Sequence, residues 1–176
     1  EIGIFIAYIG AFSALLAAII ATKQTDIKKI LAYSTMSQLG YMFIAVGLGF
    51  YSSGLFHVFT HAFFKAMLFM GAGGVIIALH HEQNIFNIAK HRAILPIISA
   101  TFLIGVIAIS GIPPFSGFFS KDAILAAAFQ EGHYLIYGIA LFTAFLTAFY
   151  MFRLYFVVFV TPNHHKKEYV YTSKTI

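Results

Sequence analysis

The sequence contains no cysteine, and only 10% of its 176 residues are charged. The absence of cysteine excludes disulfides, thiolate zinc sites and iron–sulfur clusters from this segment. The low charge, together with 60% hydrophobic residues and a mean hydropathy of +0.87, lies outside the usual balance of soluble proteins. Composition therefore predicts an integral membrane protein.

Charge is also absent from long stretches of the chain. Residues 2–21 form an uncharged apolar run, which is long enough to cross a hydrocarbon core of about 30 Å. The run lacks a basic leader and a small-residue cleavage site, so we interpret it as a transmembrane helix and not as a signal peptide. Because the chain starts at Glu1 and not at Met, we expect it to be a fragment of a longer protein.

Further apolar runs predict four more helices. The expected ranges are 26–50, 54–79, 95–130 and 134–160. A straight helix over 95–130 would measure about 54 Å at 1.5 Å per residue, too long for one span. The Pro113-Pro114 pair within it removes backbone donors and predicts a break. An unwound segment at this depth is typical of transport sites, although a simple proline kink is the alternative.

The expected fold class is therefore an all-α integral membrane protein with five transmembrane helices, the fourth broken near Pro113-Pro114. Residues 1–160 form one membrane module, and 161–176 form a polar, basic tail. Thr25 and Asp26 are residue types suited to start the second helix.

Lysine and arginine are absent from one side of this predicted arrangement. When the connections alternate between the two sides, one side receives Lys23, Lys28, Lys29, Lys90, Arg92, Lys166, Lys167 and Lys174. The positive-inside rule makes this side cytoplasmic, and we expect a multi-pass protein of the bacterial cytoplasmic membrane. The net charge of +5 thus reflects orientation in a lipid bilayer, and we expect no nucleic-acid partner.

The third expected helix carries ionisable residues on one face. His57, His61 and Lys65 are spaced four apart, in steps of about 6 Å along the helix. Lys65 lies near mid-membrane, where a charged lysine costs about 2.5 to 3.5 kcal/mol and cannot easily reach water. This pattern predicts a proton relay in which the lysine changes protonation state and the imidazoles pass protons on. Hydrogen-bonded packing histidines with a static lysine ion pair are the alternative.

Ser120, Lys121 and Asp122 follow the predicted break. We expect Ser120 to cap the second half of the broken helix, with Asp122 in its first turn. The positive helix end and the aspartate would then act oppositely on Lys121, poising it between charge states. A local ion pair at a helix start is the alternative.

Other polar residues are candidates for supporting roles. Ser34, Gln38 and Tyr41 share a face and could hold water against the relay, or form ordinary interhelical hydrogen bonds. Arg153 is placed either to support the relay or to snorkel to the interface. We expect no metal site, because the candidate ligands His80, His81, Glu82, His164 and His165 are typical of interfacial loops.

Several motifs resemble a known family. Residues 24–29 (QTDIKK), 31–40 (LAYSTMSQLG) and 56–66 (FHVFTHAFFKA) are similar to the proton-conducting antiporter-like family. This family includes antiporter-like subunits of respiratory complex I and large subunits of multisubunit sodium/proton antiporters. Residues 80–85 (HHEQNI) and 117–122 (GFFSKD) resemble the largest, most distal complex I subunit in particular.

The resemblance implies a place for the chain and roles for its residues. The family contains two inverted five-helix repeats, each with a broken helix and a lysine, and this chain resembles the second repeat. It implies that Lys65 is the central lysine, that His57 and His61 are its relay partners, and that Lys121 is the lysine at the broken helix. The first repeat and the long amphipathic helix of the distal subunit are absent from this sequence.

The function implied by the resemblance is proton translocation as part of an NADH:quinone oxidoreductase. This chain would hold no cofactor, and NADH, FMN, iron–sulfur clusters and quinone would lie in partner subunits. Other complex I membrane subunits are the expected partners, especially a neighbouring antiporter-like subunit. A sodium/proton antiporter subunit and a purely structural membrane module are the alternatives.

Overall fold

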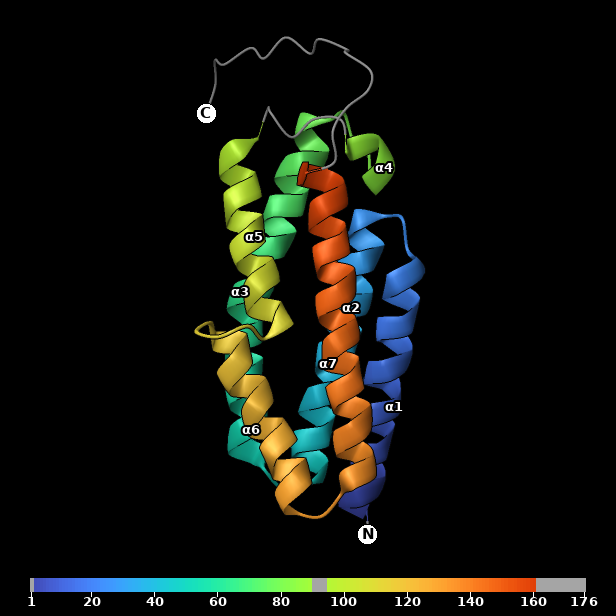
Figure 1. Cartoon of the computed structure of the whole chain (residues 1–176), viewed down its shortest axis with the longest axis vertical. Coiled ribbons are helices and arrows are strands. Elements are labelled where there is room, and N and C mark those ends of the chain that lie inside the picture. The colour runs from blue at the N-terminus through green and yellow to red at the C-terminus, as the bar shows by residue number, and fades with distance from the viewer. Residues whose placement is uncertain (1, 90–94, 161–176) are drawn as a thin grey trace.

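The computed structural model describes residues 2–89 and 95–160, which fold into a helical bundle with the amino terminus at one end (Figure 1). The predicted tail at 161–176 lies outside the described residues, as do Glu1, Lys90 and Arg92. The helices are α1 (Ile2–Lys23), α2 (Ile27–Gly47), α3 (Tyr51–Ala78), α4 (Ile85–Ile88), α5 (Pro96–Ser110), α6 (Ser116–Gln130) and α7 (Tyr134–Tyr155), and a π-helical turn, Phe156–Val160, extends α7.

The broken helix is confirmed. α5 ends at Ser110, Gly111 follows with a left-handed φ of 75°, and α6 begins at Ser116. The two pieces stand end to end in Figure 1, with the irregular segment between them near mid-height.

The predicted number of spans is met only by counting this broken pair as one. Within the described ranges, α1, α2, α3 and the extended α7 are long and apolar enough to cross a membrane. α5 and α6 have 15 residues each, about 22 Å of helix, which is too short for one crossing. Together they supply the length of the fourth crossing in chain order.

Some helix boundaries differ from the sequence prediction. Tyr51, Ser52 and Ser53, expected to form a turn, belong to α3. The chain reverses instead through Leu48, Gly49 and Phe50, where Gly49 adopts a φ of 82° that most side chains disfavour. The connection after α3 also contains the short helix α4, which the sequence did not predict.

The basic connections meet at one end of the bundle. Asp26 caps α2 as expected, and its carboxylate accepts hydrogen bonds from the Lys28 and Lys29 amides at 2.8 and 3.1 Å. The Ile27 amide then donates to the Gln83 carbonyl at 3.0 Å. The connections before α2 and after α3 therefore lie on the same side, as alternate crossings require.

α1 and α2 pack closely because glycines face each other. A Cβ atom added at Gly40 would lie 2.5 Å from the Gly10 carbonyl oxygen. Backbone approach of this kind drives helix association in lipid, where burial of apolar side chains gives little advantage.

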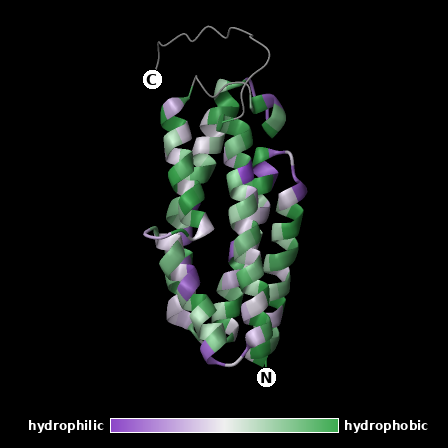
Figure 2. Ribbon diagram, viewed as in Figure 1, coloured by the Kyte–Doolittle hydropathy of each residue, from purple (hydrophilic) through white to green (hydrophobic). Residues whose placement is uncertain are grey.

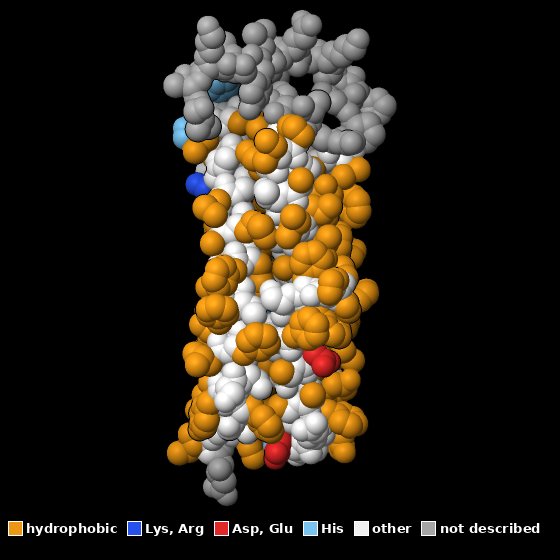
Figure 3. Space-filling view, turned by 90° about the vertical axis from the view of Figure 1, so that its left-hand side faces the viewer, with side chains coloured by type: hydrophobic (Ala, Val, Ile, Leu, Met, Phe, Trp, Pro, Cys, Tyr) orange, Lys and Arg blue, Asp and Glu red, His pale blue; other side chains and the backbone are white. Residues whose placement is uncertain are grey.

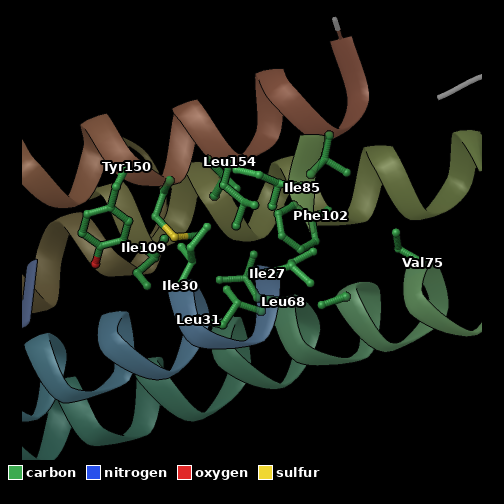
Figure 4. Packing of buried hydrophobic residues seen from close by; sticks show 14 of the residues in the cluster. Ile27, Ile30, Leu31, Leu68, Val75, Ile85, Phe102, Ile109, Tyr150 and Leu154 are labelled. Atoms are coloured by element: carbon green, nitrogen blue, oxygen red, sulfur yellow. The ribbon is translucent and has the colours of Figure 1, made fainter. Parts of the chain in front are cut away.

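The bundle is apolar both inside and outside. Leu31 of α2, Leu68 of α3, Phe102 of α5 and Leu154 of α7 pack in one buried cluster (Figure 4). Many large apolar side chains are exposed on the outside of the bundle, and hydrophobic residues make up most of the length of its helices (Figure 2). Such a surface suits lipid contact. The polar side chains buried within this apolar frame are Ser34, Ser37, Gln38, His57, Thr60, Lys65, Ser110, Ser120, Lys121, Thr143 and Thr147.

Candidate functional site: a buried lysine and histidine chain

Lys65 of α3 points into the bundle towards α2. Its ammonium donates hydrogen bonds to the Leu31 carbonyl at 2.9 Å and to the Ser34 hydroxyl. The Ser34 hydroxyl also donates to the Leu31 carbonyl, at 2.8 Å. Lys65 is only 5% exposed, so its ammonium group is hydrogen-bonded by these groups and not by bulk water.

His57 lies at the centre of a hydrogen-bonded chain that joins three helices. Its Nδ1 is 2.9 Å from the Ser120 hydroxyl of α6, and its Nε2 is 3.2 Å from the Gln38 amide oxygen of α2. The Thr60 hydroxyl donates to the Ser120 hydroxyl at 3.0 Å. Hydroxyls and imidazoles each donate and accept, so this chain can pass a proton by rearranging its hydrogen bonds.

Lys121 of α6 bridges the helix break. Its ammonium donates a 2.5 Å hydrogen bond to the Ile109 carbonyl in the last turn of α5, and it lies 5.5 Å from the centre of the Tyr41 ring. The Tyr41 hydroxyl is held by the Ala140 carbonyl at 2.6 Å. The lysine cation therefore faces the negative end of α5, which stabilises positive charge.

This arrangement corrects the sequence prediction for Ser120, Lys121 and Asp122. α6 begins at Ser116, and the backbone of Phe115 takes the capping position without a side-chain cap. Ser120 is thus in the second turn, where its hydroxyl binds His57, and Asp122 is beyond the first turn. The prediction was wrong because a good capping residue type does not fix a helix start when Pro113 and Pro114 already set the preceding backbone.

Asp122 is not brought together with the buried chain. Lys121 is 3% exposed, whereas the next residue, Asp122, lies on the exposed side of α6. Among the described residues, 2–89 and 95–160, none forms a hydrogen bond or an ion pair with the Asp122 carboxylate. The local Lys121–Asp122 ion pair, which was the alternative interpretation, is absent from this described part.

His61 continues the line of His57 along α3. The centres of the two rings are 6.3 Å apart, and His61 is partly exposed. Its buried Nε2 has no protein partner among the described residues, and the same holds for the Gln38 amide nitrogen and the Ser37 hydroxyl. Buried polar atoms of this kind are usual attachment points for ordered water.

The ionisable groups of the site interact electrostatically. The positive charge of Lys121 acts electrostatically on Lys65, His57 and His61. Adding a proton to one of these groups therefore changes the free energy of protonating the others.

Some polar residues of the site were missed by sequence reasoning. Thr60, three residues after His57 on the same helix face, could have been found from that spacing. Thr143 and Thr147 of α7 are fully buried, and their hydroxyls donate to carbonyls of the same helix. The buried Tyr150 hydroxyl has no hydrogen-bond partner among the described residues. The spacing of the two threonines together with Tyr150, at positions i, i+4 and i+7, could likewise have marked a common helix face.

The end of the bundle is tied together away from the buried chain. Arg153 donates to the Thr22 and Gln24 carbonyls at 2.7 and 3.2 Å, which joins α7 to the end of α1. The Glu82 carboxylate accepts hydrogen bonds from the Asn84 backbone, the Asn87 side chain and the Gln83 backbone, which hold the pKa of Glu82 below its usual value. Among the described residues no cluster of metal-ligand side chains occurs. His164 and His165 lie outside them.

Comparison with known families gives a match over most of the chain. The family described as NADH:quinone oxidoreductase/Mrp antiporter, transmembrane, matches residues 1–147.

Curated relatives are similar to the chain over nearly its whole length. It is 49% identical over 164 residues to NADH-quinone oxidoreductase subunit L of Escherichia coli strain K12, covering 93% of this chain and 26% of that protein. It is 48% identical over 175 residues to chloroplastic NAD(P)H-quinone oxidoreductase subunit 5 of Chlorokybus atmophyticus, covering 95% and 27% respectively. The chain thus spans about a quarter of the length of these relatives.

Solved structures share the fold. A chain of the Mrp complex from Dietzia sp. DQ12-45-1b matches with a TM-score of 0.80 and 25% identity, covering 88% of this chain and 30% of that chain. A chain of the membrane-bound sulfane sulfur reductase, an archaeal respiratory membrane complex, matches with a TM-score of 0.81 and 32% identity, covering 90% and 33%. The helix arrangement is therefore that of antiporter-like membrane subunits.

Proposed function

The chain belongs to the NADH:quinone oxidoreductase/Mrp antiporter membrane family, and we propose that it is a proton-translocating part of an NADH:quinone oxidoreductase subunit. Protons move through its buried lysines, histidines, hydroxyls and water, and redox chemistry in other subunits drives them. The observation that supports this most is the buried hydrogen-bonded chain of Gln38, His57 and Ser120, which has a lysine on either side.

Each group in the proposed path has a distinct part. Lys65 holds a proton on its amine, which donates a hydrogen bond to the Ser34 hydroxyl. His61 and His57 exchange protons with Lys65 through water. Ser120 continues the path towards Lys121, the lysine at the helix break. Because these groups are coupled, protonation of one lysine favours release from the other.

Other residues act on this path from its sides. Gln38 and Tyr41 position His57 and Lys121, and Ser34 orients Lys65. Asp122 contributes to the electric field at Lys121 from the outer side of α6, without contact. Arg153 supports the path indirectly by fixing α7 to α1.

The partners and the location are part of the same proposal. NADH, FMN, iron–sulfur clusters and quinone belong to other subunits, and a second antiporter-like subunit lies beside this one. The protein crosses a bacterial cytoplasmic membrane with its basic connections and tail on the cytoplasmic side. Cysteines placed at Lys28 and Glu131 should react with impermeant reagents from opposite sides, and reaction from the same side would refute this topology.

A sodium/proton antiporter subunit is a second candidate. The Mrp complex chain favours it, because the fold match there is as good as the match to the respiratory complex. Identities near 50% to NADH-quinone oxidoreductase subunits, against 25% to the Mrp chain, favour the first candidate.

The proposal is tested by replacing Lys65 in the full-length protein within its complex. Lys65→Ala should lower proton translocation per electron while the complex still assembles, because the amine serves transfer more than packing. Lys65→Arg should impair it too, since arginine holds its proton at any accessible pH. The matched control is Lys23→Ala, an exposed lysine at the end of α1. Wild-type pumping by both Lys65 variants would support a purely structural membrane module instead.

A further inference from the structure

The helix break and the start of α6 form an unusual outer surface. We call it the break surface, and its exposed residues are Ile112, Pro113, Pro114, Ser116, Phe119 and Asp122. It combines irregular backbone with a carboxylate on a bundle wall that is otherwise apolar. Figure 3, which views the side of the bundle where the break lies, shows acidic side chains within this apolar wall.

Asp122 lies too deep to reach water. It is eight residues from Gln130, the last residue of α6, which corresponds to about 12 Å along the helix. We take the polar connection after Gln130 as the edge of the hydrocarbon core, whose half-thickness is about 15 Å, so Asp122 lies about 12 Å inside it and its short side chain does not reach the edge. The carboxylate is therefore held within the hydrocarbon region.

Lipid is a poor occupant for this surface. Irregular backbone and ionised side chains at membrane depth are tolerated where protein covers them, and not where they face acyl chains. No cation or hydrogen-bond donor in residues 2–89 and 95–160 reaches the Asp122 carboxylate, and the Lys121 ammonium is bound on the inner side by Ile109. For the ionised carboxylate, a counter-charge has to come from outside this part of the chain.

We propose that the break surface docks a membrane-spanning protein helix that presents a lysine or arginine to Asp122. Charge complementarity defines this partner, because a carboxylate at this depth is stabilised by an ion pair with hydrogen bonds. The chain spans about a quarter of the length of its curated relatives, and the solved structures that it matches come from complexes. Helices from the rest of such a protein or from a neighbouring subunit could therefore cover this surface. The inference does not depend on proton translocation.

Photo-crosslinking in the assembled complex identifies the helix. A benzoylphenylalanine in place of Phe119, which is 54% exposed on the break surface, is activated in native membranes, and the adduct is sequenced by mass spectrometry. The expected adduct is a membrane-spanning peptide with a lysine or arginine in its apolar stretch. An adduct with lipid alone, a peptide without such a cation, or no protein adduct overturns the proposal.

A charge exchange then tests the pair. Asp122→Lys should lower the amount of assembled complex by about tenfold or more, because two unpaired cations would face each other at membrane depth. Replacing the partner's cation by aspartate in the same protein should restore assembly. The control is Glu131→Lys, the same reversal at an exposed acid beyond the end of α6, which should assemble normally.

Failure to restore assembly overturns the ion pair. Asp122→Asn separates this proposal from the proposed function, because it removes the charge while keeping the shape. Reduced assembly of Asp122→Asn supports docking, and any change in proton transfer per assembled complex reports separately on the field of Asp122 at Lys121. Normal assembly of Asp122→Asn together with an unrescued Asp122→Lys counts against docking, whatever happens to proton transfer.

Discussion

Replacing Ser120 by alanine tests whether the hydrogen-bonded chain itself conducts. The substitution removes the hydroxyl that joins His57 Nδ1 at 2.9 Å and Thr60 at 3.0 Å, and it leaves the imidazole nitrogen without that partner. Two buried hydrogen bonds at a net value of about 1 kcal/mol each amount to about 2 kcal/mol. If transfer from His57 towards Lys121 passes through this hydroxyl and its transition state keeps both hydrogen bonds, the barrier rises by that amount in the variant and the step slows by roughly thirtyfold.

The assay is proton uptake by vesicles that contain the complete complex, measured together with electron transfer. The control is Ser52→Ala, the same substitution at an exposed position in the first turn of α3, which should leave both rates unchanged. The amount of assembled complex is measured for each variant, so that loss of protein is not counted as loss of transfer. Proton transfer at the wild-type rate in Ser120→Ala would refute the path through Ser120.

Two further predictions concern the helix break and the connection after α3. Gly117→Ala should lower the thermal stability of the full-length protein, because a Cβ there would overlap the Ala108 carbonyl oxygen. Gly138→Ala, with open space around its Cβ, should not lower it, and equal melting temperatures of the two variants would contradict the close α5–α6 contact. The lowered pKa of Glu82 means that its carboxylate stabilises the connection above the usual glutamate pKa of about 4.3 and that this contribution is lost as pH falls through the lowered value. The protection factor of the Asn84 amide, which corrects the exchange rate for its intrinsic pH dependence, should therefore fall on acidification in the wild type and be low at neutral pH in Glu82→Ala, and protection in that variant equal to wild type would contradict the contact.

The membrane crossings could be predicted from hydropathy and charge, because a crossing depends on the length and the composition of an apolar run. The break after Ser110 was also predictable, since Pro113 and Pro114 cannot continue a helix. The start of α6 was not, because several residue types can begin a helix and the backbone before it decides among them. The spacing of His57 and Lys65 correctly predicted two inward-facing groups on α3.

The partners of these groups were less accessible to sequence reasoning. The bond between His57 and Ser120 joins residues 63 positions apart, and it depends on how α6 packs against α3. The placement of Lys121 against Ile109 depends on the angle of the break, which no spacing rule gives. The expected effect of the positive helix end on Lys121 assumed a helix start at Ser120, so the true start at Ser116 removed the basis for that expectation.

The most direct measurement is the number of protons translocated per electron in the complete complex after replacement of Lys121. Lys121→Arg keeps a cation near the Ile109 carbonyl but does not release its proton, and Lys121→Ala removes the amine. The account predicts a lower ratio in both variants, with assembly retained and with Lys23→Arg at the wild-type ratio. A wild-type ratio in both Lys121→Arg and Lys121→Ala would show that this lysine only holds α5 and α6 together, and that protons do not pass through the buried chain at the break.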